Sequence, residues 1–274
     1  MVNKILFGDC RETLKTIDTK ARMCVTSPPY YGLRNYGGED KQIGMEQTPE
    51  EYIEQLVDVF RSVRDVLHDD GTLWLNIGDT YYNYRSDGNY PKQTVSRTKQ
   101  DLPDFSPVRG NKLHNLKSKD LIGIPWMLAF ALRADGWWLR QDIIWNKPNP
   151  MPESVKDRCT KSHEYIFLLS KSKQYFYDNE AIKEPVKQDW GTRDRTNGKY
   201  HNPGSGLAPH SGLSKSYDRK NKRSVWTVTN KPYKGAHFAC FPPDLIEPCI
   251  LAGSEENDIV LDPFMGSGTT AMVA

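Results

Sequence analysis

A chain of 274 residues, 37% of them hydrophobic, is long enough for one large α/β domain with insertions, and its net charge of +2 looks neutral. Five cysteines without C-x-x-C spacing argue against a disulfide framework and against a metal site. There is no signal-like start and no 18-residue apolar stretch, so we expect no membrane span and a cytoplasmic protein, in a prokaryotic cell or a virus-infected host cell.

The predicted elements alternate between strands and helices along the chain. We expect strands at residues 4–7, 23–26, 72–77, 137–145, 164–169 and 259–261. We expect helices at residues 48–68, 125–134 and 243–251. The first helix has the clearest signals, with Thr48 as N-cap, Pro49 at the first helical position and Glu51 completing a capping box. This alternation predicts an α/β fold with a mostly parallel sheet and helices on both faces.

Two polar segments interrupt the pattern and hold the excess positive charge. Between Lys183 and Lys234, twelve Lys or Arg stand against four Asp or Glu, and between Arg85 and Asp120 eight stand against four. The rest of the chain must therefore carry a net charge of −10. Such concentration is typical of a surface that meets a polyanion, and a pair of solvated basic loops is the alternative.

Acidic and polar residues follow several predicted strands. Asp9, Ser27, Asp79 and Asp262 each come just after a predicted strand end. In a parallel sheet, ligands bind outside the carboxyl ends of the strands. We therefore expect these four residues on one rim of the sheet.

The first motif, Thr26-Ser27-Pro28-Pro29-Tyr30, is a rigid polar turn with an aromatic side chain. Its two prolines lock φ and remove two N–H donors, while the carbonyls before them can still accept. A planar amino group needs two acceptors and a stacking face. The Ser27 hydroxyl and the Pro28 carbonyl can accept, and Tyr30 can stack. An ordinary proline turn is the alternative for this motif alone.

The second motif runs from Asp262 to Thr270 and reads as a strand end, a glycine turn and a helix start. Gly266 and Gly268 let the backbone approach a ligand closely, and the helix start offers N–H groups to the carboxylate or ribose of a nucleoside. The lysine of a phosphate-binding loop is absent after Gly268, which argues against a nucleoside triphosphate site.

Together and in this order, the two motifs resemble those of the DNA amino-methyltransferases that use S-adenosylmethionine, in the β arrangement. Further segments that resemble the family lie at 7–10, 71–79, 144–164 and 237–245. The resemblance implies a Rossmann-like methyltransferase fold with circularly permuted motif order and basic loop insertions. It also implies three parts: a catalytic part at 1–183, a target-recognition insert at 184–235 and a cofactor-binding part at 236–274.

The resemblance implies direct methyl transfer to a base that has swung out of the DNA helix. The expected catalytic residues are Ser27, Pro28, Pro29 and Tyr30. The residues expected to bind S-adenosylmethionine are Asp9, Cys10, Thr26, Phe241, Pro242, Asp262, Pro263, Phe264, Gly266, Gly268, Thr269 and Thr270. Among them, Asp9 would receive the adenine amino group, and Cys10 is expected to pack rather than react.

The expected partner is double-stranded DNA. The residues expected to bind it are Lys147, Arg193, Arg195, Arg219, Lys220, Lys222 and Arg223. A solvated side chain is the alternative for Lys147, a disordered loop for 184–235, and a simple loop for 84–118, which would otherwise close over DNA. The family also suggests a cognate restriction endonuclease as a further partner, and it leaves a homodimer open.

A serine at the first position of the motif, Ser27, resembles the cytosine-N4 enzymes. Adenine-N6 enzymes more often carry Asp or Asn at that position, so adenine is the alternative base. The family has a further helix and an acid-ended strand after the glycine motif, and neither lies within these 274 residues. We therefore expect weak cofactor binding by this span. Two other hypotheses are an inactive DNA-binding remnant and a methyltransferase acting on protein or RNA amides.

Overall fold

The computed structural model describes residues 3–32, 42–82, 115–186, 218–230 and 241–274. The chain forms two compact units. The first consists of Met1–Tyr177 and Ser224–Ala274, and the second is Asp178–Arg223. None of the helices in the described ranges has both the length and the apolar character that a membrane span requires.

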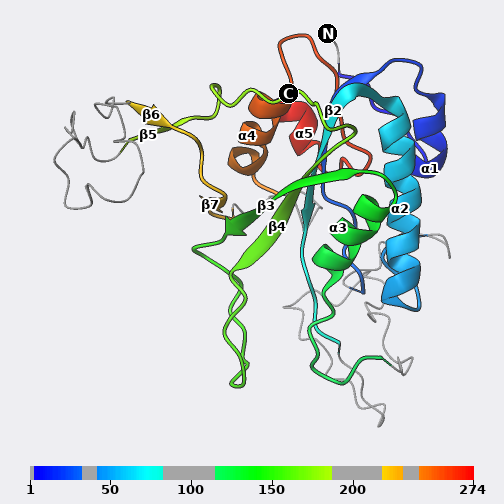
Figure 1. The fold of residues 1–274 in the computed structure, drawn as a ribbon. Coiled ribbons are helices and arrows are strands. Elements are labelled where there is room, and N and C mark those ends of the chain that lie inside the picture. The colour runs from blue at the N-terminus through cyan, green and yellow to red at the C-terminus, as the bar shows by residue number, and fades with distance from the viewer. Residues whose placement is uncertain (1–2, 33–41, 83–114, 187–217, 231–240) are drawn as a thin grey trace, which may run out of the picture. The chain divides into compact units, whose positions relative to one another are not determined.

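In the described residues, the first unit is built on a six-stranded sheet in the order β7-β3-β4-β2-β1-β8 (Figure 1). The strands are β1 (Ala21–Thr26), β2 (Leu67–Ile77), β3 (Trp138–Asn146), β4 (His163–Ser170), β7 (Val225–Thr227) and β8 (Val260–Leu261). Strand β1 is parallel to β2 and β8, and β3 is parallel to β7. Only β4 runs against its neighbours β2 and β3, so the prediction of a mostly parallel sheet is confirmed.

Helices cover both faces of this sheet, as predicted. On one face lie α2 (Pro49–Val66) and α3 (Ile124–Ala134), and on the other α4 (Pro243–Gly253) and α5 (Thr269–Val273) (Figure 1). Short α1 (Cys10–Thr13) and the 3-10 turn Leu14–Thr16 contact α2. The side chains of β1 and β2 alternate between the two layers, since Cys24 and Leu73 join the core under α2 and α3, whereas Met23 and Trp74 approach α4.

Helix α2 begins as the sequence predicts. The Thr48 hydroxyl accepts from the Glu51 backbone N–H at 3.1 Å, and the Glu51 carboxylate accepts from the Thr48 N–H at 3.2 Å. Side chains at helical spacing face the sheet and are fully buried, among them Tyr52, Leu56 and Phe60. The helix therefore has both a satisfied first turn and a continuous apolar face.

The strand predicted at residues 4–7 is wrong. These residues form no strand, and Phe7 is 90% exposed. Three adjacent apolar residues at positions 5–7 favour a short strand, but within the described residues no neighbouring strand pairs with them, and the first strand is Ala21–Thr26. Strand β2 also starts at Leu67 rather than at residue 72, because the chain passes directly from α2 into the sheet.

The predicted insert at 184–235 is divided differently in the structure. The second unit, Asp178–Arg223, contains β5 (Glu184–Pro185) paired antiparallel with β6 (Arg219–Lys220). Strand β7 belongs to the main sheet instead, where buried Trp226 lies opposite Trp145. Its three residues stand in a polar stretch and gave no periodic signal. Of the insertion predicted at 84–118, residues 84–114 lie outside the described ranges.

Candidate active site

Three of the four residues predicted to share a rim do so. Strands β1, β2 and β8 are parallel, so Ser27, Asp79 and Asp262, which follow them, lie at the same edge of the sheet. Because β4 runs the other way, its first residues, His163 and Glu164, come to this edge as well. Asp9 follows no strand and instead forms the N-cap of α1.

The first motif is held by α2. The hydroxyl of buried Tyr52 donates a hydrogen bond of 2.7 Å to the Pro29 carbonyl. Within the described residues, the Pro28 carbonyl accepts no hydrogen bond. Pro28 itself is buried, and Ser27 is partly exposed at the rim. The turn is thus anchored through one proline carbonyl, while the other is available as an acceptor.

The Tyr30 ring is fixed against the end of β2. A Cβ at Gly78 would lie 2.7 Å from the Tyr30 ring, so the ring packs directly on this glycine. The Tyr30 hydroxyl donates to Glu164 Oε2 at 2.7 Å. Burial and then the Glu164 carboxylate raise the pKa of Tyr30 well above its ordinary value, so the phenol stays a donor. A small cavity of about 50 Å³ adjoins the ring, lined by Tyr30, Tyr31, Gly78, Asp79, Thr80 and Ile124.

Glu164 is a site residue that the sequence interpretation did not select. Its other oxygen accepts from the Lys147 ammonium, and both side chains are only about 15% exposed. The ammonium also lies 4.0 Å from the centre of the Trp145 ring. The structure therefore places Lys147 in an enclosed ion pair and not in solvent. Lys147 lies near Glu164 because the antiparallel pairing of β3 with β4 sets Asn146 opposite His163.

Asp79 has a structural task at this rim. Its carboxylate accepts from the backbone N–H groups of Thr80, Gly123 and Ile124 at 2.9 to 3.1 Å, which caps the start of α3. The Asp79 carbonyl accepts from the Lys161 ammonium at 2.6 Å, and burial lowers the pKa of Lys161. Helix α3 has no cap of its own because its N-cap residue is Gly123, so the strand end supplies one.

A single carboxylate joins the two sequence motifs. Asp262 accepts from the Thr26 hydroxyl at 2.5 Å and from the Phe264 N–H at 3.0 Å on one oxygen, and from the Thr270 hydroxyl at 2.5 Å on the other. Burial raises the pKa of Asp262 to about 6. The pairing of Cys24 with Leu261 in the sheet leads the two segments into this contact. The predicted proximity of the motifs is confirmed.

The glycine turn leaves room for a ligand. Gly266 and Gly268 have φ angles of 54° and 83°, which residues with a side chain rarely adopt. A Cβ at Gly268 would meet nothing within 4 Å. Pro263 and Phe264 lead into the turn, and the Phe264 ring packs at the edge of Phe60 with 6.5 Å between centroids. Thr269 begins α5, while Phe241 and Pro242 lead into α4, which contacts β1.

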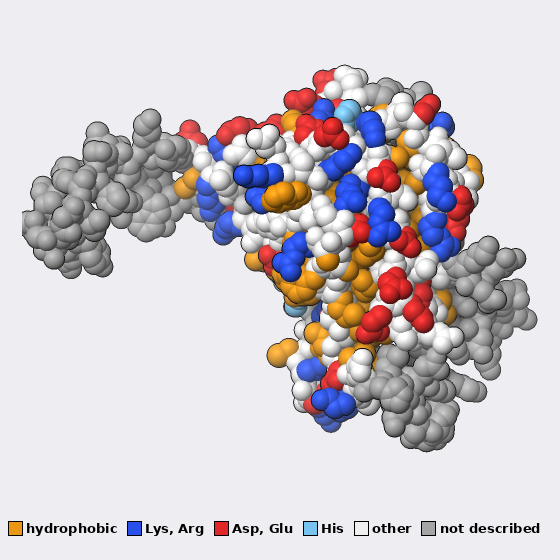
Figure 2. Space-filling model, turned by 45° about the vertical axis from the view of Figure 1, so that its right-hand side comes forward, with side chains coloured by type: hydrophobic (Ala, Val, Ile, Leu, Met, Phe, Trp, Pro, Cys, Tyr) orange, Lys and Arg blue, Asp and Glu red, His pale blue; other side chains and the backbone are white. Residues whose placement is uncertain are grey.

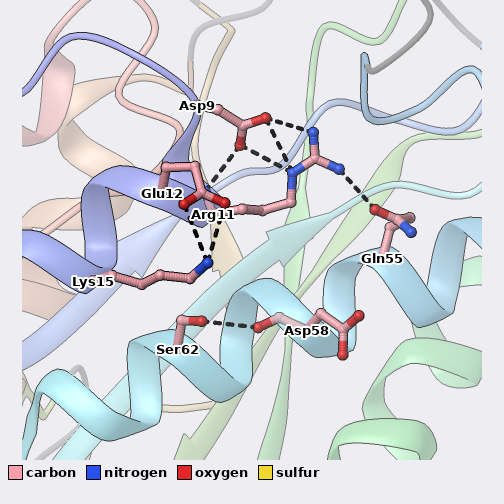
Figure 3. A network of polar contacts seen from close by, with 7 residues as sticks. All are labelled: Asp9, Arg11, Glu12, Lys15, Gln55, Asp58 and Ser62. Carbon is pink, nitrogen blue, oxygen red and sulfur yellow. Dashed lines mark hydrogen bonds and ion pairs between the residues drawn. The ribbon is translucent and has the colours of Figure 1, made fainter.

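Asp9 and Cys10 lie at the start of α1, where Asp9 is drawn with its partners (Figure 3). The Asp9 carboxylate binds the Arg11 guanidinium through both oxygens, at 3.0 and 2.5 Å, and Arg11 reaches Gln55 on α2 at 2.8 Å. Burial and then the Asp9 charge raise the pKa of the Cys10 thiol to about 11. A thiol that stays protonated is a poor nucleophile, which fits the expected packing role of Cys10.

The described basic residues of the predicted DNA interface, apart from Lys147, lie in the second unit. Arg219 donates to the Lys183 carbonyl at 3.0 Å, and Arg223 pairs with Glu184 at 3.1 Å, while Lys220 and Lys222 are partly exposed. Arg193 and Arg195 lie outside the described residues. On the face shown in Figure 2, Lys and Arg alternate with Asp and Glu. In the described ranges, no group of His, Cys, Asp and Glu could hold a metal ion.

Comparisons with known proteins identify chains that are similar to this one. A family model for N6 and N4 methylases, described as "DNA methylase", matches residues 21–274. The chain is 49% identical to the type II methyltransferase M.SmaI of Serratia marcescens, covering 98% of this chain and 82% of that protein. It is 48% identical to M.XycI of Xanthomonas campestris pv. cyanopsidis, covering 97% and 77%.

Solved structures show the same fold. The PvuII DNA methyltransferase, described as cytosine-N4-specific, has a TM-score of 0.60 at 18% identity, covering 97% of this chain and 76% of that chain. A putative DNA modification methylase from Thermus thermophilus, complexed with S-adenosyl-L-methionine, has a TM-score of 0.55 at 21% identity, covering 97% and 81%. These likenesses confirm the predicted Rossmann-like methyltransferase fold.

Proposed function

The chain belongs to the N6/N4 family of DNA methylases, which use S-adenosylmethionine, and from this premise we propose that it methylates the N4 amino group of a cytosine in double-stranded DNA. The observation that carries the proposal is the Asp262 carboxylate, which joins Thr26, at the head of the Ser-Pro-Pro-Tyr turn, to Thr270 beyond the glycine turn. An amino-group pocket and a nucleoside pocket therefore adjoin, as direct transfer between two bound ligands requires.

The glycine turn fits the nucleoside part of the methyl donor. The open space at Gly268 and the left-handed backbone give a ligand access to the main chain. We assign Asp262, Gly266, Gly268, Thr269 and their neighbours to this pocket. Asp9 fits it less well in the present conformation, because both of its oxygens already bind Arg11, so an adenine amino group would have to share or displace that contact.

When bound, S-adenosylmethionine supplies an electrophilic methyl group on its sulfonium. The chain's own residues orient the acceptor. The Pro28 carbonyl and the Ser27 hydroxyl accept from the base amino group and direct its nitrogen lone pair, and the Tyr30 ring stacks on the base. Positioning of this kind needs no covalent attachment to the protein, and the protonated thiol of Cys10 agrees with that.

The preference for cytosine rests on Ser27, because adenine-N6 enzymes more often carry an acid or amide at that position. Adenine N6 is the alternative acceptor. For the DNA contact we assign target recognition to the second unit and to its basic residues Arg219, Lys220, Lys222 and Arg223. The names of the type II relatives support a cognate restriction endonuclease as a partner system.

The test is labelled methyl transfer from S-adenosylmethionine to unmethylated plasmid DNA, with the product nucleosides identified by mass. We expect N4-methylcytosine. N6-methyladenine would keep the reaction and overturn the choice of base. No product from a folded protein at saturating S-adenosylmethionine, or full activity in both Ser27→Ala and Tyr30→Ala, would overturn the assignment of the site. Binding to DNA should persist in both variants, which separates loss of chemistry from loss of substrate.

A further inference from the structure

The Tyr30 ring is restrained at three points. Its backbone end is fixed by the turn that Tyr52 anchors at the Pro29 carbonyl. One side of the ring rests on Gly78, where even a methyl group would be too close. Its hydroxyl is bound to Glu164 at 2.7 Å. A tyrosine side chain has only two rotatable bonds, so a fixed backbone and a fixed hydroxyl set the direction of the ring's long axis, and the contact with Gly78 restrains rotation of the ring about that axis.

The groups around the hydroxyl make the Glu164 contact the dominant one. Asn76, which is 4% exposed, places its amide oxygen 3.4 Å from the Tyr30 hydroxyl and its amide nitrogen 3.4 Å from Glu164. Both distances are at the long limit for a hydrogen bond, whereas 2.7 Å to a carboxylate is a charge-assisted bond. Among the described groups, the Ser27 side chain also forms a hydrogen bond with Tyr30. Lys147 contacts the other Glu164 oxygen, and the Lys161 charge also acts on this region.

Stability alone does not explain the enclosed ion pair between Glu164 and Lys147. Taking Glu164 and Lys147 out of water carries a desolvation cost that their mutual attraction roughly offsets, so well-packed apolar residues would hold the fold equally well. An apolar side chain at 164 would leave the Tyr30 hydroxyl without its charged acceptor. We infer that the main role of the Glu164–Lys147 pair is to hold the Tyr30 hydroxyl and not to stabilise the core.

We propose that Glu164, held by Lys147, is a positioning residue that fixes the direction of the Tyr30 ring axis, and so holds the ring against Gly78 for stacking on the target base. Glu164 acts through Tyr30 and takes no part in bond making. The inference rests on the proposed function, since it presupposes that Tyr30 stacks on a base that receives a methyl group.

The test compares Glu164→Gln, Tyr30→Phe and the double variant in methyl transfer to plasmid DNA. Tyr30→Phe keeps the ring and leaves the Glu164–Lys147 pair in place, so it preserves the fold. Each single change should lower kcat about 10- to 100-fold, as expected for loss of a hydrogen bond to a charged group. The KM values for DNA and for S-adenosylmethionine should change little. The double variant should be no slower than the slower single variant, because the hydrogen bond between Tyr30 and Glu164 is the interaction that both changes affect.

The matched control is Asp258→Asn. The Arg22–Asp258 pair is enclosed to a similar degree, with side chains 20% and 19% exposed, but it lies at the opposite end of the strands. Asp258→Asn should lower the melting temperature about as much as Glu164→Gln does, and it should keep the wild-type kcat.

Three outcomes would overturn the inference while wild-type protein transfers methyl groups: unchanged kcat in Glu164→Gln, additive losses in the double variant, or an equal kcat loss in Asp258→Asn. If wild-type protein transfers no methyl group, the proposed function fails first, and the positioning role fails with it.

Discussion

Gly78 tests the active-site geometry from the side of the sheet. We predict that Gly78→Ala lowers kcat strongly while the protein stays folded. The added Cβ would lie 2.7 Å from Tyr30 Cε2 and 3.3 Å from two further ring atoms, whereas ordinary contact begins at 3.4 Å. The ring must therefore move by about 0.7 Å, and with it the hydroxyl that binds Glu164.

The size of the effect follows from this displacement. Misplacement of a positioning group by about 1 Å can cost on the order of 100-fold in rate, so we expect a loss of about 10- to 100-fold in kcat. Overpacking by one methyl group typically costs about 1–3 kcal/mol in the free energy of unfolding, which leaves the protein folded at room temperature. The expected signature is a loss of rate without a matching loss of folded protein.

Steady-state methyl transfer at saturating DNA and S-adenosylmethionine measures kcat, and single-turnover transfer isolates the chemical step. Urea unfolding measures stability. Gly253→Ala is the control, because its Cβ would lie 2.9 Å from the side chains of Met23 and Trp74 on the other face of the sheet. It should cost similar stability and leave the rate intact. A Gly78→Ala protein with wild-type kcat would show that the position of the Tyr30 ring does not limit the reaction.

Three further predictions concern the groups around this site. Tyr52→Phe removes the bond to the Pro29 carbonyl, so it should cost about 1–2 kcal/mol in urea unfolding and also lower kcat. Asp262 has a native pKa of about 6 against an ordinary 3.8, so the native state keeps its proton to higher pH than the unfolded state does. Its contribution to stability should therefore fall as the pH rises from about 4 to about 6, by on the order of 3 kcal/mol, and Asp262→Asn should lack this fall when unfolding is compared across that range. Because the pKa of Cys10 is about 11, its thiol should react slowly with iodoacetamide at about pH 8, and Cys10→Ala should keep methyl transfer; rapid labelling at Cys10, found by peptide mass mapping, would contradict this.

Local signals in the sequence were sufficient for α2 and for most of the rim. The capping box at Thr48 and Glu51 involves neighbours in the chain, and helical spacing marks the buried face. Ser27 and Asp262 follow apolar strands that end in motifs of recognisable chemistry. Such features depend on a few adjacent residues, so a single sequence reveals them.

Contacts that depend on strand direction could not be predicted in the same way. Glu164 stands 134 positions after Tyr30, and the two meet only because β4 runs against β2. The expectation at residues 4–7 failed because a three-residue apolar run does not specify a pairing partner. Strand β7 exists but could not be predicted, because Val225 and Thr227 are exposed and only Trp226 is buried.

The bond between Asp262 and Thr26 joins residues 236 positions apart in the chain, and the pairing of β1 with β8 brings them together. The spacing of the two pockets is set by one strand pairing and one carboxylate, and these would be unchanged if the chain were opened between the motifs. The contact between the two motifs therefore does not depend on which motif comes first in the chain. Two separately expressed fragments that each carry one motif, and that together retain α2, β2 and β4, should reassemble it when β1 pairs with β8.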